Sequence, residues 1–182
     1  MSCEPRWTVL VNLANEHKWK RGVEVGVLMC QTFEQLLLQC KDLHMIGVDP
    51  LTPQPLTVFS DDGTRYRAHN WLEYQYKMTT VLERFKVRAT WLRMTSEEAA
   101  PHVEDESQDF VFIDADHDTP AVQKDIRLWF PKLKTDGWLT GHDTHFPTVR
   151  RVLDEWLPGW KQRDDNVWTI PKRMIDADRF VL

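Results

Sequence analysis

Short apolar runs alternate with helical patterns along most of this chain, and the alternation limits its fold more than any other feature. The apolar runs lie at residues 22–28, 44–49, 87–94, 109–114 and 138–141. Helical spacing or helix-start signals follow them at residues 31–40, 70–86, 96–102, 119–133 and 147–157. Strands that alternate with helices form parallel sheets covered by helices on both faces. We therefore expect an α/β fold, a three-layer sandwich around a mostly parallel sheet.

Four further stretches complete the outline of a single domain over residues 1–182. Residues 1–20 contain an amphipathic stretch and are expected to form an N-terminal helical segment. Residues 50–69 are rich in proline and in turn residues, which predicts a long loop, and loops of this length are often functional. Residues 134–137, Lys-Thr-Asp-Gly, predict a turn, and residues 160–170 predict a closing hairpin.

The composition fits one globular domain and argues against several classes of partner. The 182 residues are 42% hydrophobic and 28% charged, with a net charge of −5. Because no block is dense in Lys and Arg, we expect no nucleic-acid partner. No apolar run approaches the ~18 residues of a membrane-spanning helix, so we expect no membrane partner. The three cysteines form no CxxC motif, which favours reduced thiols and a cytoplasmic location.

Polar side chains recur where the predicted strands end. These groups are Glu24 with Gly26, Asp49, Ser96 with Glu97, Asp114 with His117, and His142 with Asp143. In open parallel sheets, ligands bind in the crevice outside the carboxyl ends of the strands. One carboxylate at such a position is often only a turn residue or a helix cap, but a series of them along one edge indicates a ligand site.

The turn after the first predicted strand lacks the full glycine pattern of dinucleotide-binding proteins. Gly26 is followed by Val-Leu-Met-Cys-Gln, so the second and third glycines of GxGxxG are missing. Asp49 lies 23 residues beyond Gly26, where an acidic side chain can accept hydrogen bonds from both hydroxyls of a ribose. A turn or cap role for Asp49 before Pro50 is the alternative. The pattern favours a nucleoside-containing cofactor and disfavours a nicotinamide-dependent oxidoreductase.

Four segments together resemble the class I, Rossmann-like methyltransferases that depend on S-adenosylmethionine. They read GVEVGVLMCQTFEQLL, MIGVDP, DFVFIDADH and LKTDGWLTGHD, and the resemblance covers roughly residues 20–157. It implies a seven-stranded sheet whose last strand is antiparallel. The cofactor-binding residues that it implies are Glu24 and Gly26 for the methionine part, Asp49 for the ribose, Ser96 and Glu97 for the adenine, and Asp114 in addition. Cys30 stands where a small glycine is usual in the family.

The last two segments resemble, more narrowly, the divalent-metal O-methyltransferases of the catechol, caffeoyl-coenzyme A and macrolide-sugar types. In that group an Asp ending the fourth strand and two polar residues ending the fifth hold a magnesium ion. The matching metal ligands are Asp114, His142 and Asp143, and the position of the base matches His117. A hydroxyl bound to such an ion becomes more acidic, and an imidazole with a pKa near ~6.5 can take its proton at neutral pH. Asp114 and His117 are therefore the candidate catalytic residues.

His142 departs from the acidic residue that is usual at its position, and three interpretations follow. Imidazole is a poor ligand for Mg²⁺. His142 could contact the metal ligands without binding the ion itself. Alternatively, the ion is a softer one such as Mn²⁺ or Fe²⁺, or no metal binds and His142 or His117 acts as the base directly. If a metal is bound, we expect Mg²⁺ or Mn²⁺.

The expected function is S-adenosylmethionine-dependent O-methylation of a small polar molecule. The loop at 50–69 and the N-terminal segment are the expected walls of the acceptor site, and Asp61, Asp62, Arg65 and Arg67 favour a polar or sugar-like acceptor. The chain is short for this fold, so a homodimer could supply a missing wall. The alternatives are a methyltransferase with a nitrogen or macromolecular acceptor and a non-catalytic, methyltransferase-like binding subunit.

Overall fold

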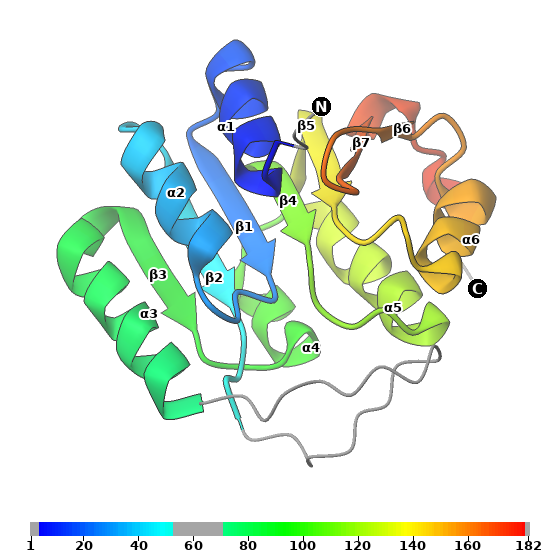
Figure 1. Ribbon diagram of the computed structural model, residues 1–182. Coiled ribbons are helices and arrows are strands. Elements are labelled where there is room, and N and C mark those ends of the chain that lie inside the picture. The colour runs from blue at the N-terminus through cyan, green and yellow to red at the C-terminus, as the bar shows by residue number, and fades with distance from the viewer. Residues whose placement is uncertain (1–3, 53–70, 181–182) are drawn as a thin grey trace.

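The sheet has the strand directions that the sequence predicts. The computed structural model describes residues 4–52 and 71–180, and within them one sheet has seven strands in the order β3-β2-β1-β4-β5-β7-β6 (Figure 1). The strands are β1 (Arg21–Val25), β2 (His44–Val48), β3 (Ala89–Leu92), β4 (Gln108–Ile113), β5 (Leu133–Gly141), β6 (Lys161–Gln162) and β7 (Trp168–Pro171). Strands β1 to β5 pair in parallel, and β7 pairs antiparallel with both β5 and β6. The mostly parallel sheet with an antiparallel last strand is confirmed.

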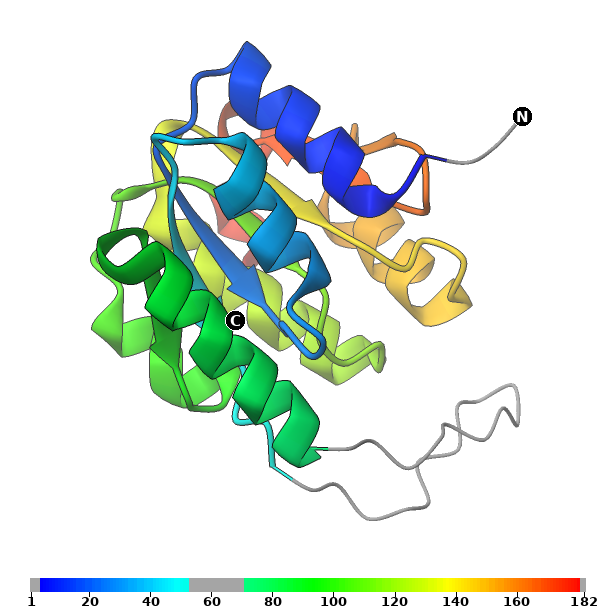
Figure 2. The same cartoon turned by 60° about the vertical axis from the view of Figure 1, so that its left-hand side comes forward.

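Helices cover both faces of this sheet, which confirms the three-layer sandwich. One face carries α1 (Arg6–Glu16), α2 (Gln31–Gln39) and α3 (Trp71–Phe85), which stand in front of the sheet in Figure 2. The other face carries α4 (Ser96–Ala99), α5 (Thr119–Trp129) and α6 (Pro147–Trp156). Helix α1 falls inside the predicted N-terminal helical segment. Among the described residues, no helix combines the length and the apolar character that crossing a bilayer requires.

The alternation of side chains along each strand divides the core between the two faces. Phe110 and Phe112 of β4 pack with α1, α2 and α3, whereas Val111 and Ile113 pack with α4, α5 and α6. Successive residues of a strand point to opposite faces of the sheet. The unbroken apolar run of β4 therefore serves both layers, as is typical of a parallel strand that is buried on both sides.

Two predictions about the segment before β5 are wrong. Leu133 is fully buried, but it begins β5 and does not extend the apolar face of α5. Helix α5 ends at Trp129, because a 3₁₀ turn that contains a proline follows it. Residues 134–137 lie inside β5 and form no turn. The pairing of β4 with β5 shifts register between Gln108 and Phe110, and this irregularity accommodates the turn-like sequence within the strand.

Strands β1 and β3 are shorter than their apolar runs. The end of β1 and the start of β3 each have a local cause. Strand β1 ends at Val25, because Gly26 adopts a φ of +87° and turns the chain away. Strand β3 begins at Ala89, after a 3₁₀ turn over Lys86–Arg88. Apart from residues 50–52, the predicted loop at 50–69 lies outside the described residues, and so do the four charged residues expected to favour a polar acceptor.

Candidate functional site

Side chains from two neighbouring strand ends converge at the carboxyl edge of the sheet. Asp114 directly follows β4, and His142 and Asp143 directly follow β5. One ligand atom from each of these residues lies within 4.8 Å of the others. Strands β4 and β5 are parallel neighbours, so their carboxyl ends meet at the same place. The fold thus brings together the three residues that the sequence predicts as metal ligands.

Asp143 is the centre of this cluster. Its Oδ2 atom lies 2.6 Å from Nε2 of His117, and its Oδ1 atom lies 2.9 Å from Nδ1 of His142. The backbone φ of Asp143 is +68°, in the left-handed region that Asp tolerates better than most residues. Burial alone would raise the pKa of Asp143, but the two imidazoles outweigh burial and hold that pKa below its usual range. Asp143 is therefore an anion at neutral pH.

His117 is held between Asp143 and an aromatic ring. Its ring stacks on Phe146, with 4.5 Å between the ring centroids and 23° between the planes. Burial alone would lower the pKa of His117, but the hydrogen bond and the charge of Asp143 raise it above the ordinary value. The side chain is 34% exposed, so an oriented imidazole with access to solvent stands beside the cluster, as a proton acceptor requires.

His142 has two buried ring nitrogens, and neither makes a hydrogen bond with a described residue. Nδ1 nevertheless lies 2.9 Å from Asp143 and 3.5 Å from Asp114, so the distances are short while the hydrogen-bond geometry is poor. Burial alone would lower the pKa of His142, but the two carboxylates raise it. Without a cation the ring is thus held as an imidazolium. Because buried polar atoms without hydrogen bonds often mark an ion site, the same donor set also fits a shared divalent cation.

Arg6, the first residue of α1, is a site residue that sequence reasoning missed. Its Nε atom lies 3.5 Å from Oδ2 of Asp114 and donates a hydrogen bond of 3.1 Å to Oγ1 of Thr32. Its backbone N–H donates to Asp165 at 2.8 Å. No motif links Arg6 to these partners, because three-dimensional packing alone brings the start of α1 to the strand ends.

Glu24 and Gly26 lie beside Asp114. The side chain of Glu24 is buried, and its Oε2 atom makes no hydrogen bond with a described residue. Burial and then the charge of Asp114 raise the pKa of Glu24 well above its ordinary value. At Gly26 a Cβ atom would lie only 2.7 Å from the carbonyl carbon of Asp114 and 2.8 Å from Cα of Ala115. Glycine therefore allows the turn after β1 to pass directly over the end of β4.

Asp49 shapes that turn. Its Oδ2 atom accepts hydrogen bonds from the N–H groups of Val27 and Leu28 at 3.1 and 3.0 Å, and its Oδ1 atom accepts one from Leu51 at 2.8 Å. Cys30 adopts a φ of +57°, a conformation that glycine takes without strain, so the chain follows a glycine-like path there. Asp49 thus has a turn-forming role, and its contact with a ribose stays a prediction.

Ser96 and Glu97 lie at the start of α4, which follows β3. The Oγ atom of Ser96 donates to Asp125 and accepts a hydrogen bond of 2.8 Å from Nε1 of Trp129. The side chain of Glu97 is exposed and lies 3.3 Å from Lys124. The hydroxyl of Ser96 therefore ties α4 to α5, and contact of either residue with an adenine stays a prediction.

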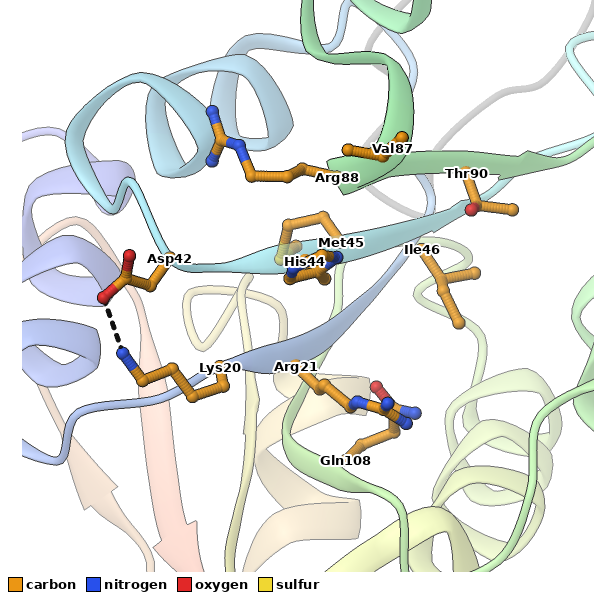
Figure 3. A pocket seen from close by; sticks show the side chains of 10 residues that line it. All are labelled: Lys20, Arg21, Asp42, His44, Met45, Ile46, Val87, Arg88, Thr90 and Gln108. Carbon is orange, nitrogen blue, oxygen red and sulfur yellow. Dashed lines mark hydrogen bonds and ion pairs between the residues drawn. The ribbon is translucent and has the colours of Figure 1, made fainter.

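A polar cavity of about 460 Å³ lies at the opposite edge of the sheet (Figure 3). Its lining includes Arg21, His44 and Gln108. These residues are the first of β1, β2 and β4, respectively, whereas the cluster around Asp143 lies where the strands end. The cavity is therefore separate from the candidate site.

Several proteins of known structure share this fold. A putative caffeoyl-CoA O-methyltransferase from Staphylococcus aureus superimposes with a TM-score of 0.63 and 16% identity, over 94% of this chain and 84% of that one. The O-methyltransferase TomG from Streptomyces achromogenes, in complex with SAM, gives 0.61 and 11%, over 93% and 80%. The SAH-bound methyltransferase PaMTH1 from Podospora anserina gives 0.60 and 12%, over 93% and 78%.

At these identities the three structures establish a shared fold, and the sequence itself establishes the family. No curated protein sequence matches this chain significantly. A family model described as a methyltransferase domain matches residues 22–144, a region that covers more than half of the chain and contains Glu24, Asp49, Asp114 and Asp143. The chain belongs to this methyltransferase family.

Proposed function

We propose that this protein transfers the methyl group of S-adenosylmethionine to a hydroxyl of a small polar acceptor, with a divalent cation and a histidine base. The observation that carries the proposal is the convergence of Asp114, His142 and Asp143, with His117 bonded to Asp143, at the ligand-binding edge of a methyltransferase fold. Two similar structures are described as bound to SAM or SAH, which supports this choice of cofactor.

The cofactor would lie against the turn after β1. We assign its methionine part to Glu24, Gly26 and Asp114, and its ribose to Asp49. The close approach of the turn to β4 at Gly26 supports this placement, and so does the Oε2 atom of Glu24, which makes no hydrogen bond within the described part of the chain. Ser96 and Glu97, at the start of α4, would border the adenine.

Asp114, His142 and Asp143 would hold the cation. Carboxylate oxygens suit both Mg²⁺ and Mn²⁺, and the imidazole nitrogen favours Mn²⁺. A divalent cation at this place would lower the pKa of an acceptor hydroxyl by stabilising its anion.

His117 would take the proton of the acceptor hydroxyl. When its Nε2–H donates to Asp143, the ring lone pair lies on Nδ1, and Asp143 stabilises the imidazolium that forms. S-adenosylmethionine would supply the methyl group: its carbon–sulfur bond would break as the acceptor oxygen bonds to the methyl carbon, with S-adenosylhomocysteine as the leaving product. The main contribution of the fold to this step is the alignment of oxygen, methyl and sulfur.

The test measures formation of S-adenosylhomocysteine by mass spectrometry with a panel of phenols, catechols, sugars and amines. We expect turnover with a hydroxylated acceptor, a loss of turnover in EDTA, and recovery when Mg²⁺ or Mn²⁺ is added. His117→Ala should lower turnover by about 10²–10⁴-fold, the usual cost of losing a general base. His102→Ala is the matched control, because His102 is exposed in a separate 3₁₀ turn.

Each part of the proposal has its own contradicting result. Full turnover in EDTA would exclude a role for a cation. Full turnover of His117→Ala would exclude His117 as the base. Products with amines alone would indicate a nitrogen acceptor. Binding of S-adenosylmethionine without turnover on any acceptor would favour the non-catalytic alternative.

A further inference from the structure

Arg6 and His142 approach Asp114 at different carboxylate oxygens. The two carboxylate oxygens of Asp114 face different neighbours, because Oδ1 lies 3.5 Å from His142 and Oδ2 lies 3.5 Å from Arg6. Arg6 also bonds to Thr32, in the first turn of α2. Helix α2 directly follows the turn that begins at Gly26, so the guanidinium stands beside that turn.

The guanidinium is fixed at one end and available at the other. Nε is engaged by Thr32 and Asp114, and the backbone N–H of Arg6 is held by Asp165. Within residues 4–52 and 71–180, the two terminal nitrogens of Arg6 make no hydrogen bond or ion pair. The planar fork of an arginine matches a carboxylate, and two parallel hydrogen bonds can form.

The charges near Arg6 are those that a free amino acid requires. Glu24 is buried and presents an Oε2 atom that makes no hydrogen bond within the described residues. Asp114 is nearly buried next to it, and both carboxylates lie close enough to Arg6 to sense its charge. The carboxyl groups of Glu24 and Asp114 can accept hydrogen bonds from an ammonium group, while the guanidinium of Arg6 can pair with a carboxylate, and a zwitterion offers both groups. A ligand without an amino-acid part would leave this arrangement unpaired.

We propose that Arg6 binds the carboxylate of the amino-acid part of the cofactor, while Glu24 faces its ammonium group. This inference rests on the proposed function, because it assumes that S-adenosylmethionine is the cofactor. It makes the start of α1, outside the region that matches the family model, a part of the cofactor site.

The experiment compares two ligands by calorimetry. S-adenosylhomocysteine carries the amino-acid part, whereas 5′-methylthioadenosine shares the adenine, ribose and sulfur and lacks the amino-acid part. Each ligand is titrated into the wild type, Arg6→Gln, Arg6→Lys and the control Arg84→Gln. Arg84 is a matched control, because it forms an exposed ion pair with Glu34 at 3.2 Å. Thermal melts of all four proteins establish that they are folded.

We expect Arg6→Gln to bind S-adenosylhomocysteine at least tenfold more weakly, which corresponds to about 1.4 kcal/mol. Its affinity for 5′-methylthioadenosine should stay within about twofold of wild type, because this ligand has no carboxylate for Arg6 to bind. Arg6→Lys should fall between wild type and Arg6→Gln, because it keeps the charge and loses the fork. Arg84→Gln should match wild type with both ligands.

Two results would overturn the inference and leave the proposed function standing. Equal weakening for both ligands in Arg6→Gln would show that Arg6 only supports the fold of the site. Unchanged affinity of Arg6→Gln for both ligands would exclude contact between Arg6 and the cofactor. A raised KM for the acceptor in that variant would then indicate that Arg6 binds a carboxylate of the acceptor. If wild-type protein binds neither ligand, the proposed function itself fails.

Discussion

Replacement of Gly26 by alanine should destabilise the protein through two separate effects. The first is backbone strain, because φ is +87° at Gly26 and a left-handed conformation costs an L-residue about 1–2 kcal/mol. The second is a collision, because a Cβ atom would lie 2.7 Å from the carbonyl carbon of Asp114 and 2.8 Å from Cα of Ala115. Both atoms belong to the backbone, so neither can rotate away, and overpacking of this kind costs about 1–3 kcal/mol.

Together these effects predict a loss of about 2–5 kcal/mol in the free energy of unfolding. For a domain of this size, 1 kcal/mol lowers Tm by about 2–4 °C. Gly159→Ala is the matched control, since φ is +97° there but the nearest atom is the flexible end of Met174, at 3.3 Å. It should lose only the strain, about 1–2 kcal/mol.

Urea denaturation followed by circular dichroism, with thermal melts of the same proteins, measures both variants. We expect Gly26→Ala to unfold at a clearly lower urea concentration than Gly159→Ala. If the two variants lose the same free energy, the close approach of the turn to β4 does not constrain this position, and the reasoning from the fold is refuted.

Three other perturbations have defined outcomes. Burial raises the pKa of Asp125 to about 6, above the ~3.9 of an unfolded chain, so the stabilising contribution of its neutral form is lost as pH rises from about 4 to 7. In urea titrations, the free energy of unfolding of Asp125→Asn should rise by roughly 1–3 kcal/mol relative to that of wild type over this pH range. A difference between the two proteins that does not change with pH would contradict this. Thr95→Ala breaks the capping box with Glu98 and should cost about 1 kcal/mol in a thermal melt; an unchanged Tm would show that α4 needs no cap. Asp49→Ala removes two hydrogen bonds to the turn after β1 and one to Leu51. It should weaken the binding of S-adenosylhomocysteine at least tenfold by calorimetry, about 1.4 kcal/mol, whereas the exposed Asp42→Ala should not, and equal affinities would exclude Asp49 from the cofactor site.

Most of the fold follows from local patterns in the sequence. The apolar run of β4 predicts a buried parallel strand, and the spacing of Phe33, Leu36 and Leu37 predicts the buried face of α2. Residues 134–137 are misleading, because Lys-Thr-Asp-Gly is turn-like by itself. There the strand continues as a bulge, because Leu133 pairs with Gln108 and Trp138 pairs with Phe110, and residues 134–137 lie between these paired positions.

The site is only partly visible in the sequence, for a physical reason. Asp114, His142 and Asp143 can be placed together because parallel strands end at one edge, so strand order alone implies their proximity. Arg6 cannot be found in this way, and neither can Asp125, the hydrogen-bond partner of Ser96. Arg6 reaches the strand ends through the docking of α1, and Asp125 is a polar residue of a helix whose burial beside Ser96 has no periodic signature.

Parallel calorimetric titrations of the wild-type protein with S-adenosylmethionine and with NAD⁺ distinguish a methyltransferase from a dinucleotide-dependent enzyme. We expect one S-adenosylmethionine site with a Kd of the order of 1 μM, about −8 kcal/mol. We expect no heat with NAD⁺, because the turn after Gly26 lacks the glycines that let a pyrophosphate approach the backbone. Tight binding of NAD⁺ without binding of S-adenosylmethionine would contradict both the proposed function and the roles assigned to Glu24 and Asp49.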